Sequence, residues 1–254
     1  MASLSVVVPA FNAGAFLKSA VDSLLAENLP GLEVLVVDDG STDGSVAAVE
    51  RLNVRVVRQE NRGEAAARNT GVRAATAPLV TFLDADDRIA PGGLRVRLDY
   101  LSARPEECVV GGLPSRLIDE RGDTAAEVFK RMQSKLSFPF RLNDAYYRAG
   151  NFFPVSCSLY LYRREVFDRV GFYDEALPAA PDCDFHFHLL KTVEIPILAV
   201  PGFDRRIHGS NLSLAGAGTK AMAFRPEILE AVRVINRRHG FDPKEIVPWE
   251  LEYL

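Results

Sequence analysis

The sequence lacks the features that would place the chain in a membrane, in a disulfide-rich fold or on nucleic acid. Its 254 residues include only three cysteines, Cys108, Cys157 and Cys183. They have no zinc-like spacing and cannot all pair, which predicts a reducing, cytosolic compartment. The net charge of −4 and the pI near 5.7 argue against a surface built for nucleic acid.

The sequence also shows no pattern typical of a targeting or membrane-spanning segment. The first residues carry no basic stretch, and the apolar run after them is broken at Pro9, so we expect no signal peptide. No apolar run approaches the roughly 18 residues that a transmembrane helix needs. A lipid acceptor would therefore be met at the inner face of the bilayer or through a partner protein.

What is present is a 48% hydrophobic chain in which apolar runs alternate with helical periods. The pattern predicts strands at 4–9, 33–37, 53–58 and 79–83, and helices at 15–26, 45–51, 65–75 and 91–103. Strands that alternate with helices in this way form a doubly wound parallel sheet with right-handed crossovers.

The second half of the chain is less regular. We expect strands at 108–112, 155–162 and 195–200, an arm at 203–208, and helices at 163–169, 180–191 and 221–238, followed by a tail at 241–254. Residues 113–151 show no clean period and are interpreted as a variable insert. Its aromatic residues, around Phe140 and Tyr146, would form either a wall over the site or ordinary surface helices.

One short stretch concentrates negative charge at the end of a predicted strand. Asp84, Asp86 and Asp87 lie within four residues, directly after the apolar run that ends at Leu83. Carboxylates this close repel one another unless a cation or a hydrogen-bonding ligand lies among them. The stretch therefore predicts either a divalent metal site that faces a phosphate or an acidic turn before the helix near Pro91.

A second acidic cluster follows the second predicted strand. Asp38 and Asp39 stand directly after the run that ends at Val37. Parallel strands bring their carboxyl ends to one edge of the sheet, where open α/β folds bind ligands. The two clusters together favour a ligand site at that edge.

Four motifs carry a resemblance to a known family. They occur in order at familiar spacings, and they are Ser5-Val6-Val7-Val8-Pro9-Ala10-Phe11-Asn12, Val36-Val37-Asp38-Asp39-Gly40-Ser41-Thr42-Asp43, Asn61-Arg62-Gly63 with Ala67-Arg68-Asn69, and Leu83-Asp84-Ala85-Asp86-Asp87. Together they resemble the inverting family 2 glycosyltransferases with the GT-A fold. The match is close over about the first 90 residues and looser from Gly150 to Ser213.

The resemblance implies an architecture. It predicts an α/β protein with the GT-A fold, a Rossmann-like three-layer α/β/α arrangement with a mostly parallel central sheet and a C-terminal helical extension. Residues 1–112 would form the half that binds the nucleotide-sugar donor. Residues 113–220 would form the acceptor and catalytic-base half of the same domain, and residues 221–254 the C-terminal helix and tail.

The resemblance also assigns the donor nucleotide. It gives Asp39 a hydrogen bond from the base and places Pro9, Ala10 and Phe11 along the base pocket. Asp39 as a turn residue that satisfies backbone N–H groups is the alternative. Arg68 would face the nucleotide or its phosphates, or else be a solvated helix residue.

Within Asp84-Ala85-Asp86 the resemblance gives Asp84 to the ribose and Asp86 to the metal, with Asp87 as a supporting turn residue. Mn2+ or Mg2+ suits ligation by oxygen atoms. The metal would neutralise charge as the nucleoside diphosphate leaves.

An inverting transfer needs a general base for the acceptor hydroxyl. In the family this carboxylate lies in a Glu-Asp-x-Asp stretch at a helix start, which here is Pro181-Asp182-Cys183-Asp184. Asp182 matches the base, and Asp184 is the second choice. Both would otherwise be acids stabilised at a helix N-terminus, and the missing glutamate leaves the acceptor class open.

The histidines divide into three groups. His208 resembles the histidine of the family's C-terminal Arg-x-His segment and is the second candidate metal ligand, with a simple structural turn as the alternative. His186 and His188 are interpreted as acceptor-site wall or surface, and His239 as a C-cap residue before Gly240.

The resemblance predicts a metal-dependent enzyme that moves a sugar from a UDP- or dTDP-type donor to an acceptor hydroxyl. The product would be a cell-surface polysaccharide, glycolipid or glycoconjugate, and the acceptor a sugar, a lipid-linked molecule or another hydroxyl compound. The alternatives are a catalytically impaired glycosyltransferase-like binding protein and a nucleotidyltransferase. The first loop lacks the Gly-rich, basic character that a nucleotidyltransferase usually has, and no G-x-G-x-x-G motif marks a dinucleotide oxidoreductase.

Overall fold

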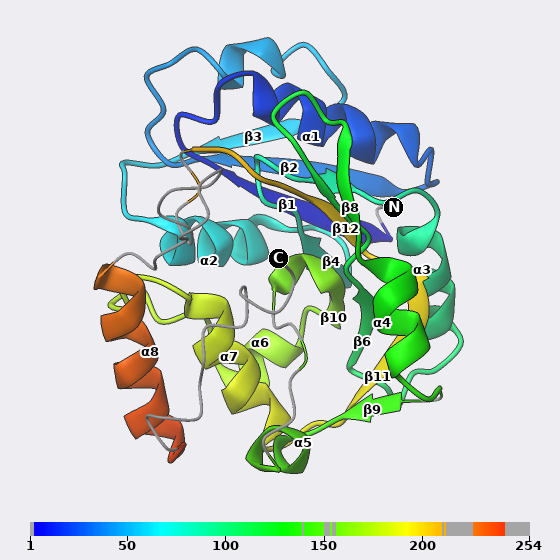
Figure 1. The fold of residues 1–254 in the computed structure, drawn as a ribbon. Coiled ribbons are helices and arrows are strands. Elements are labelled where there is room, and N and C mark those ends of the chain that lie inside the picture. The colour runs from blue at the N-terminus through cyan, green and yellow to red at the C-terminus, as the bar shows by residue number, and fades with distance from the viewer. Residues whose placement is uncertain are drawn as a thin grey trace.

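The structure is a computed structural model that describes residues 3–138, 140–149, 153, 156–209, 211 and 226–241. Its centre is an eight-stranded sheet in the order β3-β2-β1-β4-β10-β6-β11-β9. Figure 1 shows this sheet running diagonally through the molecule with helices along it. The strands are β1 (Leu4–Ala10), β2 (Leu32–Asp38), β3 (Arg55–Arg58), β4 (Leu79–Phe82), β6 (Val109–Leu113), β9 (Phe140–Leu142), β10 (Tyr160–Arg163) and β11 (Ile195–Pro201).

The first half of the sheet is parallel throughout. β1 pairs in parallel with β2 and β4, and β2 pairs in parallel with β3. Leu4, Val6, Val7 and Val8 are all fully buried in β1, as expected for a central strand covered on both faces. The predicted doubly wound sheet is confirmed in this half.

The second half of the sheet contains both parallel and antiparallel strand pairs. β10 runs antiparallel to both of its neighbours, β4 and β6, and β9 runs antiparallel to β11. Because β10 lies between β4 and β6, residues before and after position 113 share one sheet. A boundary at that position would therefore separate two functional halves and not two independently folding domains.

The helices cover both faces of the sheet. α1 (Gly14–Ala26) and α2 (Glu64–Ala74) lie on opposite sides of the β1–β3 segment (Figure 1), while α3 (Gly93–Ser102) packs against β6 and β11. α2 approaches β1 closely, since a Cβ added at Gly71 would lie 2.2 Å from Cγ1 of Val7. The remaining helices are α4 (Phe129–Lys135), α5 (Asp144–Arg148), α6 (Val166–Val170), α7 (Pro181–Leu190), α8 (Pro226–His239) and the short 3-10 turns η1 (Val46–Ala48) and η2 (Cys157–Leu159).

A small second sheet stands beside the carboxyl end of β4. Its order is β5-β12-β7-β8, made from β5 (Arg88–Ile89), β12 (Phe203–Arg206), β7 (Arg116–Ile118) and β8 (Thr124–Glu127). β12 is antiparallel to β5 and parallel to β7. This pairing brings a segment near residue 205 next to the acidic stretch that follows β4.

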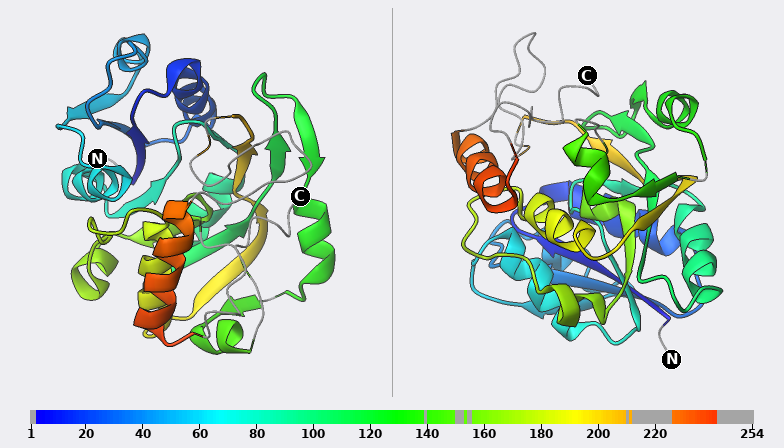
Figure 2. Two further views of the ribbon diagram at one scale, coloured as in Figure 1. Left: turned by 60° about the vertical axis from the view of Figure 1, so that its left-hand side comes forward. Right: turned by 90° about the horizontal axis from the view of Figure 1, so that it is seen from below.

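α8 lies along α7 in every view (Figures 1 and 2), and the two helices are in contact. The expected helix start at residue 221 and the predicted tail at 241–254 fall largely outside the described residues. α7 begins at Pro181, as predicted, because a proline in the first helical turn loses no hydrogen bond.

One expected helix needs correction, and one segment contains elements that the pattern did not predict. The helix predicted at 45–51 is only the single 3-10 turn η1, and the residues after it form turns and a bend before β3 begins. The insert at 113–151, whose sequence shows no clean period, contains β7, β8, α4, β9 and α5 among its described residues. These elements are too short to produce a recognisable period.

The aromatic residues of the insert pack into the fold. Phe140 contacts Tyr146 at 5.1 Å between ring centroids, and Tyr147 contacts Phe187 of α7 at 5.2 Å. The three cysteines form no disulfide within the part of the chain that the structure describes. In that same part, none of the helices combines the length and the apolarity that crossing a bilayer requires.

A close contact between α3 and β11 yields a stability prediction. A Cβ added at Gly93 would lie 1.7 Å from the carbonyl oxygen of Pro201, an atom of the rigid backbone. In an exposed helix Gly→Ala would stabilise by about 0.5–1 kcal/mol. Here we expect Gly93→Ala to lower the free energy of unfolding by about 1–3 kcal/mol, because α3 must move away from β11.

Urea denaturation would measure this loss. Arg95→Ala, an exposed position on the same helix, is the matched control and should change stability by less than about 0.5 kcal/mol. A Gly93→Ala protein as stable as the wild type would contradict the packing described here.

Candidate functional site

The carboxyl ends of β1, β2 and β4 lie side by side, and their loops hold one another. Several hydrogen bonds fasten the first loop to the second, and the shortest run from Thr42 N to Asn12 Oδ1 (2.8 Å) and from Gly14 N to Asp43 Oδ2 (2.8 Å). Asn12 has a φ of 48°, a left-handed conformation that asparagine tolerates better than most residues. The loops therefore form a fixed rim at this edge of the sheet.

Asp39 is buried at the end of β2 and accepts three hydrogen bonds. The donors are Gln59 Nε2 (2.7 Å), Arg62 N (2.9 Å) and Gly63 N (2.8 Å). A carboxylate has about four acceptor positions, so one stays open on Oδ2. Asp39 thus ties the end of β2 to the loop that leads into α2.

The three residues predicted to line a base pocket follow each other at the end of β1. Pro9 is half-buried and Ala10 is buried, whereas Phe11 is 51% exposed. Phe11 is one of the most exposed large apolar side chains among the described residues. Its ring at the rim of the site is available for stacking.

Arg68 lies beneath the site and not on the surface. Its side chain is 1% exposed, and Nη2 donates to Asp84 Oδ1 at 2.7 Å while also pairing with Glu64. The alternative of a solvated helix arginine is therefore wrong. The side chain of Asp84 is 32% exposed and keeps its second oxygen outside this pair.

Asp86 meets His208 although 122 positions separate them in the sequence. Asp86 Oδ2 lies 3.0 Å from His208 Nε2 and 3.4 Å from Asn211 Nδ2. The imidazole is 7% exposed and packs against the ring of Phe16 at 4.8 Å. The two residues predicted as metal ligands thus lie next to each other.

Arg206 holds this arrangement in place. The Arg206 side chain donates from Nε to the carbonyl oxygen of Asp86 (2.8 Å), and its backbone N–H donates to Asp87 Oδ1 (2.8 Å). Burial, together with the charges of Asp86 and Asp84, raises the pKa of Asp87 well above its usual value. Asp87 is therefore a buried turn residue that supports the acidic stretch from below.

Asp182 and Asp184 begin α7 but face different surroundings. Asp182 is half-buried, and its negative charge acts on Glu64, Arg68 and Cys157. Asp182 therefore shares one electrostatic environment with the Arg68–Asp84 pair. Asp184 is directed toward α8.

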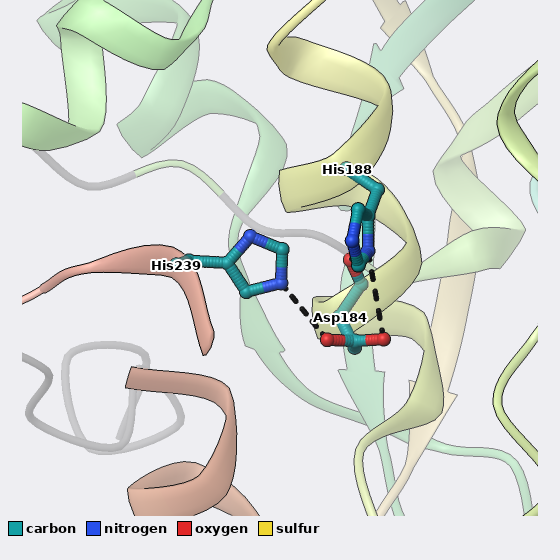
Figure 3. A group of neighbouring side chains, drawn as sticks. All are labelled: Asp184, His188 and His239. Atoms are coloured by element: carbon teal, nitrogen blue, oxygen red, sulfur yellow. Dashed lines mark hydrogen bonds and ion pairs between the residues drawn. The ribbon is translucent and has the colours of Figure 1, made fainter. Parts of the chain in front are cut away.

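The partners of Asp184 connect α7 with α8 (Figure 3). Asp184 Oδ1 lies 2.8 Å from His239 Nε2, and Oδ2 accepts from Arg238 Nη1 at 2.8 Å. Arg238 also bridges to Asp174 at 2.9 Å. We call these four residues the clasp between the two helices.

His188 lies against the clasp and raises the question of a metal there. Asp184, His188 and His239 offer three ligand atoms within 4.8 Å of one another. The positive charge of Arg238 on the same carboxylate disfavours a cation. Nδ1 of His239 is buried without an acceptor among the described residues, whereas a metal-bound histidine normally donates its other N–H.

The clasp also sets the charge of Asp184. Burial alone would raise the pKa of Asp184, but the His239 hydrogen bond and the Arg238 charge outweigh it, and the pKa lies below its ordinary value. The carboxylate is therefore ionised, and both of its oxygens are engaged. His239 is therefore more than the predicted C-cap residue, because it also binds Asp184. Gly240, the next residue, ends the helix with a φ of 72°.

His186 is a core residue, so its interpretation as wall or surface is wrong. The ring is fully buried, with Nδ1 2.7 Å from the carbonyl oxygen of Asp182 and Nε2 2.7 Å from the Tyr162 hydroxyl. Burial lowers the pKa of His186 to about 3. His188, by contrast, is 43% exposed.

Sequence reasoning missed two residues of the site, Glu64 and Arg206. Glu64 stands four positions before Arg68, a helical spacing that could have shown their pairing. Arg206 belonged to a recognised segment, but its contacts with the Asp86 carbonyl oxygen and the Asp87 carboxylate depend on the pairing of β12 with β5. Short strands of this kind leave little signal in a sequence.

Comparisons with known proteins agree with this geometry. Residues 5–171 match the family model described as "Glycosyl transferase family 2". The uncharacterized glycosyltransferase EpsJ of Bacillus subtilis is 30% identical over 199 residues, which are 75% of this chain and 57% of that protein. The uncharacterized glycosyltransferase YibD of Escherichia coli is 39% identical over 93 residues, which are 35% of this chain and 27% of that protein.

A solved structure shares the fold. S. aureus TarS 1–349 in complex with UDP-GlcNAc superposes with a TM-score of 0.69 at 21% identity, covering 92% of this chain and 66% of that one. The predicted GT-A fold is confirmed by this match and by the sheet topology. The chain spans about a quarter to just over half the length of these two curated relatives.

The buried His186 predicts a pH-dependent stability. Folded His186 stays neutral down to about pH 3, whereas an unfolded histidine takes up a proton below about pH 6.5. The unfolded state then binds more protons, so stability falls by up to about 1.4 kcal/mol for each pH unit below 6.5.

Urea denaturation between pH 4.5 and 8 would measure this slope. His186→Asn removes the titrating group and should flatten the curve below pH 6.5, whatever its effect on stability at pH 8. Equal slopes for the two proteins would contradict a neutral, buried His186.

Proposed function

The chain belongs to glycosyl transferase family 2, and from that premise we propose that it is a metal-dependent, inverting glycosyltransferase. It would transfer a sugar from a UDP- or dTDP-type donor to an acceptor hydroxyl in the synthesis of a polysaccharide, glycolipid or glycoconjugate. The observation that carries the proposal is the meeting of Asp86 and His208 at 3.0 Å, at the sheet edge that also presents Asp39 and Asp84. The complex of TarS with UDP-GlcNAc supports a uridine nucleotide as donor.

The residues present fit a divalent metal. Asp86 supplies a carboxylate oxygen and His208 an imidazole nitrogen, and these are donors that Mn2+ accepts, while Mg2+ favours the oxygen. The side chain of Asp86 is 32% exposed, so one side of the pair is accessible. When bound there, the metal would neutralise the charge of the leaving nucleoside diphosphate.

The charge around the site also favours a metal. Asp84 and Asp86 face a site that must receive a doubly charged diphosphate, and negative charges repel one another. The buried arginines that contact this stretch, Arg68 and Arg206, both direct their charges to protein oxygens. A bound cation would remove the repulsion.

The donor nucleotide would use the residues at the ends of the first strands. Asp39 keeps one acceptor position for an N–H of the base, and Phe11 supplies an exposed ring at the end of the neighbouring strand β1. Asp84 keeps one oxygen for a ribose hydroxyl because Arg68 engages only Oδ1. Residues 1–112 would thus bind the donor, while 113–220 supply the base and the acceptor surface and 221–254 the C-terminal helix and tail.

Asp182 is our proposal for the general base. Both oxygens of Asp184 are held in the clasp, so Asp184 has little capacity to accept a proton. Asp182 lies two positions earlier, toward Arg68 and Asp84. Its carboxylate would take the acceptor proton as the hydroxyl attacks from the side opposite the leaving group.

The alternative of an impaired enzyme rests on one observation. Proline stands at position 181, where related enzymes have glutamate before the base. An impaired protein would bind the nucleotide with metal but would neither hydrolyse nor transfer the sugar. Hydrolysis of UDP-sugars with and without Mn2+ distinguishes it from an active enzyme.

Loss of the metal pair should weaken nucleotide binding. We expect Asp86→Ala and His208→Ala each to reduce the affinity for UDP in the presence of Mn2+ by about 10- to 100-fold, because the diphosphate would meet uncompensated carboxylates. Isothermal titration calorimetry measures the affinity. Unchanged affinity in Asp86→Ala would overturn metal-dependent donor binding.

Substitutions of the two aspartates of α7 should have different effects, one on catalysis and the other on stability. Asp182→Asn should lower kcat by about 100- to 10,000-fold with little change in the donor KM or in Tm. Asp184→Asn should lower Tm, because it weakens a buried ion pair between α7 and α8. Full activity in Asp182→Asn would contradict the assignment of the base.

A further inference from the structure

Glu64 is a carboxylate at the site to which the proposed mechanism gives no role. It opens α2 directly after Gly63, pairs with Arg68 four residues later, and its side chain is 37% exposed. An exposed pair at this spacing on an ordinary helix contributes only about 0.3–0.5 kcal/mol. The Glu64 pair differs from such pairs because its arginine is buried.

Arg68 is shared between two carboxylates. The same nitrogen, Nη2, contacts Glu64 and Asp84 Oδ1, so each acid engages one of its two hydrogens. Nε and Nη1 are buried and find no hydrogen-bond partner among the described residues. Glu64 and Asp84 are therefore the two direct hydrogen-bonding anchors of this guanidinium in that part of the chain.

The backbone of Glu64 is fixed as well. The preceding residue, Gly63, donates its N–H to Asp39 Oδ2 at 2.8 Å. Gly63 has a φ of 89°, which suits glycine, and this turn sets the direction in which α2 begins. Glu64 thus connects the proposed base contact, Asp39, with the proposed ribose contact, Asp84, through Arg68.

The surroundings of Glu64 contain more carboxylates, those of Asp84 and Asp182, than positive charges, of which there is Arg68. Desolvation by the surrounding protein atoms raises the pKa of Glu64, although 37% of its side chain is exposed; the Arg68 charge opposes this effect, and the charges of Asp84 and Asp182 add to it. A carboxylate is costly in such surroundings. The position of Glu64, in contact with the same Arg68 nitrogen as Asp84, favours a role in the site.

We propose that Glu64 is a positioning residue of the donor site, which holds the Arg68 guanidinium against Oδ1 of Asp84 and so keeps the second oxygen of Asp84 directed at the ribose. The proposal rests on the proposed function, because it assigns Glu64 to the nucleotide that function requires. Without Glu64, Arg68 would keep a single anchor and could turn about it. Asp84 would then lose its fixed orientation.

The test is UDP binding in the presence of Mn2+, measured by isothermal titration calorimetry. We expect Glu64→Ala to weaken UDP binding by about 10-fold, the low end of the loss seen when the partner of a ligand-contacting residue is removed. Glu64→Gln keeps an oxygen that can accept from Nη2, and it should bind within about 3-fold of the wild type. In steady-state assays Glu64→Ala should raise the donor KM and leave kcat nearly unchanged.

A matched control separates positioning from helix stability. Lys18 and Asp22 form an ion pair at the same spacing on α1, at 2.6 Å and exposed. Asp22→Ala removes a helical ion pair outside the site and should leave UDP affinity unchanged. A thermal melt of each variant confirms that it is folded at the temperature of the titration.

The outcomes are distinct. Wild-type protein that fails to bind UDP with Mn2+ would overturn the proposed function and this inference with it. Wild-type binding together with unchanged affinity in Glu64→Ala would overturn the role of Glu64 alone. Equal losses in Glu64→Ala and Glu64→Gln would also contradict positioning, because the amide retains the hydrogen bond.

Discussion

The structure depends on how it accommodates negative charge at one edge of its sheet. The ends of β2 and β4 and the start of α7 bring carboxylates into a partly buried region, where like charges repel strongly. Each is stabilised differently: Asp39 by backbone amides, Asp84 by a buried arginine, and Asp184 by a second arginine and a histidine. Asp86 differs, because the side chains that contact its carboxylate among the described residues are an imidazole, His208, and an amide, Asn211. The carboxylate assigned to a cation is thus one without an arginine ion pair among the described residues.

The same constraint explains why distant segments meet at this edge. Arg206 reaches the acidic stretch from β12, and it donates to backbone oxygens of Asp119 and Glu120 as well as to that of Asp86. One buried side chain therefore joins the insert, the acidic stretch and the segment that carries His208. Burial of an arginine is tolerated when its hydrogen bonds are made. Arg206 belongs to β12, an inner strand of the small sheet that pairs with β5 on one side and with β7 on the other.

Much of the fold was predictable from the sequence, because continuous apolar runs mark buried parallel strands. β1, β2 and β4 appeared within one or two residues of their expected bounds. The site residues at their ends followed from the rule that parallel strands share a carboxyl edge. The insert at 113–151 was not predictable, since β7 and β9 have three residues each and show no period. The burial of Arg68 and His186 also left no signal, because it depends on tertiary packing and not on local pattern.

The pair Asp182 and Asp184 shows what a sequence motif alone can and cannot predict. Two residues on a helix are separated by about 200° around its axis, so these carboxylates had to face different surroundings. Sequence could not say which one faced the sheet, because that depends on how α7 packs against β10 and α8. The buried ring of His186 contacts Tyr162 of β10 and the carbonyl oxygen of Asp182, and thereby fixes the rotation of α7. With that rotation set, Asp184 meets Arg238 and His239, and Asp182 is left toward Arg68. The proline at position 181 is compatible with this geometry, because a first-turn proline fixes the start of the helix without removing a hydrogen bond.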